Sequence, residues 1–154
     1  MLEIPGYKNL DIKNIVFDYN GTLAKDGQVT EEVKKLLKEI CLVFNVYVIT
    51  ADTFGSVKNE LKEFDLEVKV LSSSNHTKEK MEFVLSLGKE MTVAIGNGNN
   101  DKMMIDTAIL SIAIIGEEGC SKEALLASDI VCKDIKSAIE LLLHTKRLVA
   151  TLRR

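Results

Sequence analysis

The sequence predicts an α/β fold, in which a doubly wound, Rossmann-like parallel sheet is covered by helices on both faces. Short apolar runs, mostly rich in Val and Ile, alternate with amphipathic stretches, as strands alternate with helices in such folds. Several of the runs are apolar almost throughout, as is typical of strands buried on both faces. The length of 154 residues suits a single domain (1–154), and the sequence has no linker, internal repeat or low-complexity tract.

Six apolar runs are predicted as strands, in the order 15–17, 46–50, 67–71, 92–96, 111–115 and 129–133. The first helix is predicted to begin after Thr30, a suitable N-cap, because two Glu residues follow it and apolar residues then recur at helical spacing. Further helices are predicted at roughly 53–64, 77–89, 100–109 and 120–127, with a last helix from about residue 134.

Composition narrows the class of protein. The net charge is −3 and both signs are spread along the chain, which argues against nucleic acid as the main partner. No apolar run reaches membrane-spanning length, so we expect no membrane partner. Three widely spaced cysteines without metal-ligand spacing predict reduced thiols and a cytoplasmic protein. The one basic cluster, near the C-terminus, is interpreted as a solvated tail. Its members are Lys146, Arg147, Arg153 and Arg154.

Polar residues follow three of the predicted strands. The first strand ends in Asp18, the second in Thr50, and the fourth runs into the loop 96–101, "GNGNND", while Lys78 opens the helix before it. Because ligands of such sheets bind beyond the carboxyl ends of the strands, we expect these side chains to share one crevice.

The residue types in this crevice match the needs of phosphoryl transfer. A carboxylate such as Asp18 can serve as a nucleophile and form an aspartyl phosphate. The phosphoryl oxygens then need donors, which backbone amides of a Gly-rich turn, the Thr50 hydroxyl and the Lys78 ammonium can provide. A divalent cation held by carboxylates reduces the repulsion between the carboxylate nucleophile and the phosphate, so that the two anions can approach each other.

At these positions the sequence resembles the haloacid dehalogenase-like phosphohydrolases. "DYNGTL" resembles their first motif, "ITAD" the second, Lys78 the lysine of the third, and "GNGNND" the fourth, usually Gly-Asp-Gly-x-Asn-Asp. The resemblance covers residues 12–135 and is closest to the phosphorylation domain of P-type ATPases. It implies a Mg²⁺-dependent phosphohydrolase acting on a small phosphorylated substrate, a phosphomonoester or nucleotide.

The resemblance also assigns expected roles. Asp18 would be the nucleophile and a metal ligand, and Asn20 would offer its backbone carbonyl to the metal. Lys78 would neutralise the aspartyl phosphate, with Lys80 as the alternative that spacing favours less. The expected catalytic residues are Asp18, Asn20, Thr50 and Lys78. The expected phosphate-binding residues are Gly21, Thr22, Thr50, Lys78 and Asn100, with the amides of Gly21 and Thr22 facing the phosphate. The expected metal ligands are Asp18, Asn20, Asn97 and Asp101.

Two positions depart from the hydrolase pattern, each with Asn in place of Asp. Asn20 cannot shuttle a proton, so general acid–base catalysis worth about 10²–10⁴-fold should be missing. P-type ATPases also lack a carboxylate at this position. Asn97 stands where the family has a metal-binding Asp, so we expect weakened Mg²⁺ binding. Both Asn residues precede Gly, a dipeptide prone to deamidation, which would regenerate Asp.

The gaps between the motifs leave no room for the separate cap domain that covers the site in many relatives. A capless site predicts a homo-oligomer or a large substrate. Two other functions stay open. A catalytically impaired module could bind a phosphorylated ligand or a protein partner without turnover. A response-regulator receiver domain also uses Asp, Thr and Lys, but its motif order differs and it has no counterpart of "GNGNND".

Overall fold

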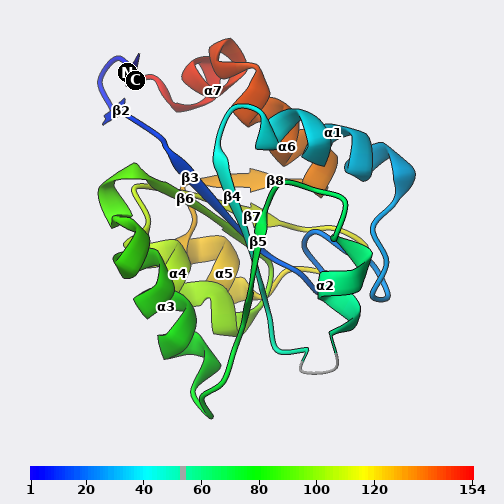
Figure 1. The fold of residues 1–154 in the computed structure, drawn as a ribbon. Coiled ribbons are helices and arrows are strands. Elements are labelled where there is room, and N and C mark those ends of the chain that lie inside the picture. Colours follow the sequence, from blue (N-terminus) through cyan, green and yellow to red (C-terminus); the bar gives the residue numbers. More distant parts are fainter. Residues whose placement is uncertain (53–54) are drawn as a thin grey trace.

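A six-stranded parallel sheet forms the centre of the computed structural model, which describes residues 1–52 and 55–154. The strand order is β5-β4-β3-β6-β7-β8, so β3 lies in the middle, between β4 and β6 (Figure 1). All neighbouring pairs are parallel. The strands are β3 (Asn14–Asp18), β4 (Asn45–Thr50), β5 (Glu67–Val70), β6 (Thr92–Gly96), β7 (Leu110–Ile114) and β8 (Ile130–Cys132).

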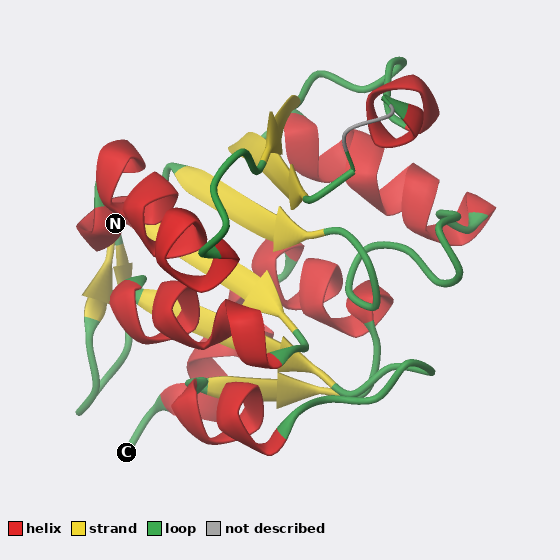
Figure 2. Cartoon of the chain, turned by 90° about the horizontal axis from the view of Figure 1, so that it is seen from below, coloured by secondary structure: helices red, strands yellow, loops and turns green. Residues whose placement is uncertain are grey.

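Helices cover both faces of this sheet (Figure 2). One face carries α1 (Glu31–Cys41), α2 (Ser56–Glu60), α6 (Ile135–Leu143) and α7 (Thr145–Leu152), and the other carries α3 (His76–Leu87), α4 (Lys102–Thr107) and α5 (Lys122–Ala127). Alternate side chains of β3 divide between the two layers. Ile15 and Phe17 join the core beneath α1 and α6, whereas Val16 joins the core beneath α3 and α4.

The α/β fold and all six predicted strands are confirmed, with ends shifted by no more than a residue or so. The helix predicted at 53–64 is shorter, since α2 covers Ser56–Glu60, and residues 53 and 54 lie outside the described part of the chain. The Thr30 cap is present, because the Thr30 hydroxyl accepts a hydrogen bond from the Val33 amide.

The basic cluster near the C-terminus is exposed, as predicted, but its residues do not form an irregular tail. Residues 145–152 form α7, in which Leu148 is buried in the core beneath α1 and α6. The chain end is also fixed, because the Arg154 amide donates to the Pro5 carbonyl and the Arg154 guanidinium lies over the Tyr7 ring. A short hairpin that was not predicted, β1 (Leu2–Glu3) with β2 (Asn9–Leu10), leads into β3.

The connections beyond the strand ends are short. Residues 19–30 between β3 and α1 form tight turns closed by an antiparallel bridge from Lys25 to Gln28. Two 3₁₀ turns, η1 (Lys89–Met91) and η2 (Asn99–Asp101), flank β6.

None of the helices in the described ranges combines the length and the apolar character needed to cross a membrane.

Candidate phosphoryl-transfer site

Asp18 ends β3 in the middle of the carboxyl edge of the sheet. Side chains alternate along a strand, so Asp18 points to the same face as Val16, toward α3 and α4. The residue is only 8% exposed. One carboxylate oxygen, Oδ1, accepts a hydrogen bond of 2.8 Å from Lys80, and Oδ2 accepts one of 3.1 Å from the Thr22 hydroxyl. The strand end therefore presents a buried carboxylate that both partners orient.

Lys80, rather than Lys78, is the lysine that reaches this carboxylate, so the prediction of Lys78 is wrong. The Lys80 ammonium lies 2.8 Å from Asp18 and 2.7 Å from Asp101, and its side chain is 3% exposed. Successive helical residues are about 100° apart, which places Lys80 on the inward face of α3 with Val84, four residues later. Lys78 lies on the opposite face, in a solvent-exposed ion pair with Glu82.

Asp101 is completely buried, and several donors satisfy its carboxylate. Oδ1 accepts from Lys80, and Oδ2 accepts from the backbone amides of Asn97 and Gly98 at 3.0 Å each. The close packing depends on Gly96, where an added Cβ would lie 2.5 Å from the Asp101 side chain. Asp101 thus fixes the loop after β6, and its predicted role at the metal stays a prediction.

Asn97 faces Asp18 across the Thr22 hydroxyl. The Thr22 Oγ1 lies 3.1 Å from both Asp18 Oδ2 and Asn97 Oδ1. The approach requires a glycine at position 21, where φ is +79° and an added Cβ would lie 2.5 Å from the Asn97 side-chain nitrogen. The structure therefore brings together the first and fourth motifs, as predicted from their positions at neighbouring strand ends.

The amides of the turn after β3 do not match their predicted role. The Gly21 amide donates to the Ala24 carbonyl at 2.9 Å, and the Thr22 amide donates to the Tyr19 carbonyl at 3.3 Å. Both donors are used within the turn, so the prediction that these two amides face phosphate is wrong.

Other predicted phosphate ligands lie at the edges of the same site. The Thr50 hydroxyl oxygen, at the end of β4, accepts from the Asp52 amide and keeps its own proton available for donation. The Asn100 Oδ1 accepts from Lys80 at 3.2 Å, which leaves its amide group as a donor. Asn20 is exposed, and its side chain lies outside the buried cluster.

Burial and the neighbouring charges both shift the pKa values of Asp18 and Lys80. Burial raises the pKa of Asp18 to about 6 with help from the Asp101 charge, while Lys80 and the Thr22 hydroxyl oppose the rise. Burial by itself would lower the pKa of Lys80, but Asp18 and Asp101 outweigh that effect and the net change is a rise. A charged lysine between two carboxylates leaves the cluster with a single net negative charge.

The side-chain oxygens of Asp18 and Asn97 are candidate ligands for a divalent cation. Asp18 Oδ2 and Asn97 Oδ1 are both oxygens and both lie within 3.1 Å of one hydroxyl, so they face a common point. Such hard oxygen donors fit Mg²⁺, which is held in proteins by one or two carboxylates together with water. Within residues 1–52 and 55–154, no group of three His, Cys, Asp or Glu side chains converges as a metal cage. The oxygens of Asp18 and Asn97 are thus chemically suited to a hydrated divalent cation.

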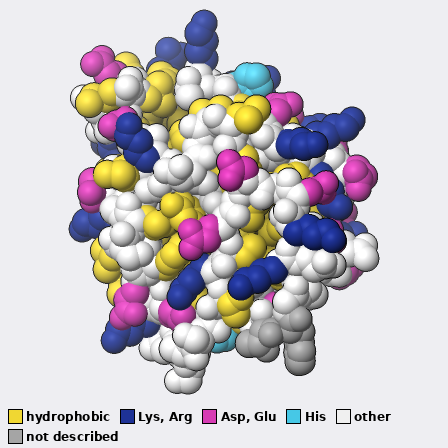
Figure 3. Space-filling view, viewed as in Figure 1, with side chains coloured by type: hydrophobic (Ala, Val, Ile, Leu, Met, Phe, Trp, Pro, Cys, Tyr) yellow, Lys and Arg dark blue, Asp and Glu magenta, His cyan; other side chains and the backbone are white. Residues whose placement is uncertain are grey.

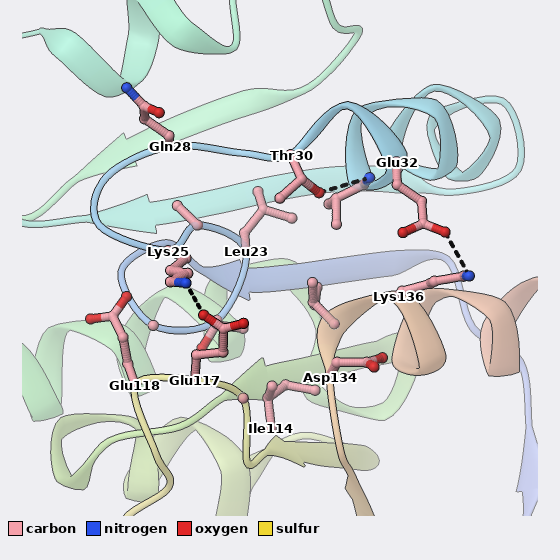
Figure 4. Close-up of a pocket in the computed structure, with 16 residues that line it drawn as sticks. Leu23, Lys25, Gln28, Thr30, Glu32, Ile114, Glu117, Glu118, Asp134 and Lys136 are labelled. Atoms are coloured by element: carbon pink, nitrogen blue, oxygen red, sulfur yellow. Dashed lines mark hydrogen bonds and ion pairs between the residues drawn. The ribbon is translucent and has the colours of Figure 1, made fainter.

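A cavity of about 280 Å³ lies beside residues 21–25 of the β3–α1 connection, next to the N-terminal ends of α1 and α6. Figure 4 shows its rim, where Lys25 pairs with Glu117 and Lys136 pairs with Glu32. Over the whole face seen in Figure 3, acidic and basic side chains are intermixed, without a dominant patch of one sign.

Sequence reasoning ranked Lys80 below Lys78 and missed the loop 116–121. Helix periodicity favours Lys80, because Lys80, Val84 and Leu87 share one face of α3. The loop 116–121 holds Asn97 through backbone groups alone. The Gly119 carbonyl accepts from the Asn97 side chain, and the Ser121 amide donates to the Asn97 carbonyl. Backbone contacts leave no side-chain signal in the sequence.

Comparisons with other sequences agree with the motif pattern. No family model matches the chain. An uncharacterised protein of Methanocaldococcus jannaschii is 52% identical over 61 residues, 40% of this chain and 66% of that protein. The mouse phospholipid-transporting ATPase ID is 30% identical over 131 residues, 82% of this chain and 11% of that protein. A soluble P-type ATPase-like phosphatase of M. jannaschii is 24% identical over 123 residues, 78% of this chain and 45% of that protein.

Solved structures share the fold over nearly the whole chain. The 3-deoxy-D-manno-octulosonate 8-phosphate phosphatase of Moraxella catarrhalis, solved with magnesium and phosphate, has a TM-score of 0.68 at 18% identity and covers 93% of this chain and 94% of its own. The cobalt-bound enzyme of Haemophilus influenzae has a TM-score of 0.72 at 13% identity, with 94% of both chains covered. The fold, the four ordered motifs and the sequence matches together show that the chain belongs to the haloacid dehalogenase-like superfamily.

Proposed function

We propose that this protein is a phosphohydrolase that works through an aspartyl phosphate on Asp18. The observation that carries the proposal is the buried Asp18 carboxylate, which lies at the carboxyl edge of the sheet with Lys80 at 2.8 Å. A nucleophile held beside a buried cation is suited to attack on an anionic phosphoryl group. The relative named a soluble P-type ATPase-like phosphatase and the two phosphatase structures support the same reaction class.

In the first step an Asp18 oxygen forms a bond to phosphorus while the bond from phosphorus to the leaving oxygen breaks. Lys80 and the Thr50 hydroxyl would stabilise charge on the phosphoryl oxygens. Mg²⁺, held by Asp18, Asn97 and the Asn20 carbonyl, would supply charge neutralisation between the two anions. In the second step water attacks phosphorus, releases phosphate and restores the Asp18 carboxylate.

The side chain of Asn20 restricts which leaving groups can depart. The Asn20 side chain can neither give a proton to the departing oxygen nor take one from water. The leaving group must therefore depart as an anion or take its proton from solvent. This favours phosphorylated substrates whose leaving group is a weak base, and it predicts slow hydrolysis of the aspartyl phosphate. Among small phosphomonoesters and nucleotides, those with the more acidic leaving group should react fastest.

The test uses p-nitrophenyl phosphate, whose leaving group needs no proton, with Mg²⁺ in the buffer. We expect the Asp18→Asn variant to lose turnover, while Asp106→Asn, the same chemical change at an exposed position of α4, keeps it. The Asn20→Asp variant should raise turnover, up to about 10²–10⁴-fold, because it restores a proton-transfer group. Equal rates for wild type and Asp18→Asn would rule out the nucleophile.

A second candidate is a module that binds a phosphorylated ligand or a protein partner without turnover. Asn20 and Asn97 favour it, because both replace carboxylates that a fast hydrolase uses. Calorimetry with phosphate in the presence of Mg²⁺ separates the two functions. Binding heat without any released product from p-nitrophenyl phosphate would support the module, whereas repeated turnover lost in Asp18→Asn supports the enzyme.

A further inference from the structure

Asn97 is held with its amide group in one orientation. Its Nδ2 donates to the Gly119 carbonyl at 3.2 Å, and its Oδ1 faces the Thr22 hydroxyl at 3.1 Å. A backbone carbonyl can only accept a hydrogen bond, so the side-chain atom beside Gly119 must be a donor. A carboxylate at position 97 would instead place an oxygen against the Gly119 oxygen. The neighbourhood of this position is therefore built for Asn and against Asp.

The loop that carries Gly119 is tied to the rest of the molecule at both ends. Figure 4 shows Glu117 paired with Lys25 of the β3–α1 connection, and the adjacent Glu118 accepts from the Asp26 amide at 3.3 Å. At the other end the Ser121 amide donates to the Asn97 carbonyl at 2.8 Å. These contacts restrain the loop on both sides of Gly119, with its carbonyl directed at the Asn97 side chain.

The presence of Asn rather than Asp at position 97 also sets the net charge of the site. Asp18 and Asp101 carry two negative charges, and Lys80, which carries one positive charge, lies within hydrogen-bond distance of each carboxylate. The carboxylates of Asp18 and Asp101 already accept hydrogen bonds from protein donors, so they do not need a divalent cation to satisfy them. An Asp at position 97 would add a second net negative charge, which attracts a divalent cation and destabilises the site without one.

We propose that the Gly119 carbonyl fixes Asn97 as a neutral oxygen ligand, so that this site takes up a divalent cation mainly together with a phosphate group. The proposal rests on the proposed function, because it concerns the same site. The phosphate contributes the negative charge that Asn97 withholds. By linkage, each ligand then raises the affinity for the other by the same factor. The species bound would be a magnesium–phosphate pair rather than free Mg²⁺.

The experiment compares wild type, Asn97→Asp and Asn20→Asp by thermal unfolding and calorimetry. Asn20→Asp is the matched control, since it makes the same chemical change before a glycine, at an exposed side chain of the same site. The probes are Mg²⁺ alone, inorganic phosphate alone, and both together. For wild type we expect a small rise of the unfolding midpoint with either probe and a larger, more than additive rise with both.

For Asn97→Asp without metal we expect a lower midpoint than for Asn20→Asp. Its affinity for Mg²⁺ alone should exceed that of wild type by about tenfold or more, because a carboxylate close to the cation adds Coulomb attraction that a neutral amide lacks. If the variant is unfolded without metal, folding regained with Mg²⁺ is the same result. The proposal is overturned if the two variants have equal midpoints, if Asn97→Asp stays unfolded with Mg²⁺ or gains no affinity, or if wild type binds Mg²⁺ equally well without phosphate.

These measurements are independent of turnover. Loss of the proposed function would appear as equal hydrolysis of p-nitrophenyl phosphate by wild type and Asp18→Asn. The difference between the Asn97 and Asn20 variants would remain in that case. A failure of either idea is therefore recognised separately.

Discussion

Removal of the Lys80 ammonium should destabilise the protein far more than removal of the Lys78 ammonium. Lys80 makes two buried ion pairs, at 2.8 Å with Asp18 and 2.7 Å with Asp101, whose side chains are 11% and 0% exposed. The Lys80→Met variant leaves both carboxylates buried without a cation, and breaking a buried pair in this way costs about 3–5 kcal/mol. Lys78 is 61% exposed and lies 3.8 Å from Glu82, and such surface pairs are worth about 0–1 kcal/mol.

The assay is thermal unfolding followed by circular dichroism, without metal or phosphate. For a chain of this size, each kcal/mol lowers the midpoint by about 2–4 °C, so Lys80→Met should unfold about 6–20 °C below wild type. Lys78→Met is the matched control, two residues away on the same helix, and its midpoint should stay within about 4 °C of wild type. Equal shifts for the two variants would refute the assignment of Lys80 to the buried cluster.

Three further predictions concern other contacts. The Gly96→Ala variant should lose about 1–3 kcal/mol in urea unfolding, because the new Cβ would lie 2.5 Å from the Asp101 side chain; an unchanged free energy of unfolding would contradict this packing. Hydrogen bonds from backbone amides lower the pKa of Glu79 to about 2, from 4.5, so its stabilisation is present above about pH 4.5 and is lost as pH falls toward 2. The stability advantage of wild type over Glu79→Gln should therefore shrink across that range, and a constant difference would argue against it. On ageing, peptide mapping should find deamidation at the exposed Asn20 before Asn97, because the Asn97 side chain is held by the Gly119 carbonyl at 3.2 Å and the Thr22 hydroxyl at 3.1 Å; the reverse order would count against this loop geometry.

The sheet could be predicted from the sequence because its strands have a direct signature. Strands such as β3 and β6 are buried on both faces, so they appear as short apolar runs between polar segments. The C-terminal helix α7 was missed because charged residues surround its few buried positions, of which Leu148 is the deepest. A narrow apolar stripe of this kind is difficult to distinguish from a solvated tail.

The site was predictable in part, for a related reason. Positions at strand ends follow from the sheet, and this placed Asp18 close to Asn97. The choice between Lys78 and Lys80 depended on the rotation of α3, which motif spacing does not determine. The partner of Asn97 is a backbone carbonyl, and residues that act through the backbone are not identified by their side-chain type.

The central position of β3 also has a consequence for synthesis. The ribosome releases the chain at about 5–20 residues per second, so β4 emerges soon after β3 and can pair with one edge of it, and β5 can then pair with β4. The other edge of β3 is occupied only by β6, and Lys80 follows Asp18 by 62 residues. The nascent chain therefore carries an apolar strand with one open edge and an unneutralised carboxylate for several seconds. Such an edge is a template for pairing with other chains, so this interval is the stage at which the protein is most exposed to aggregation and to chaperones.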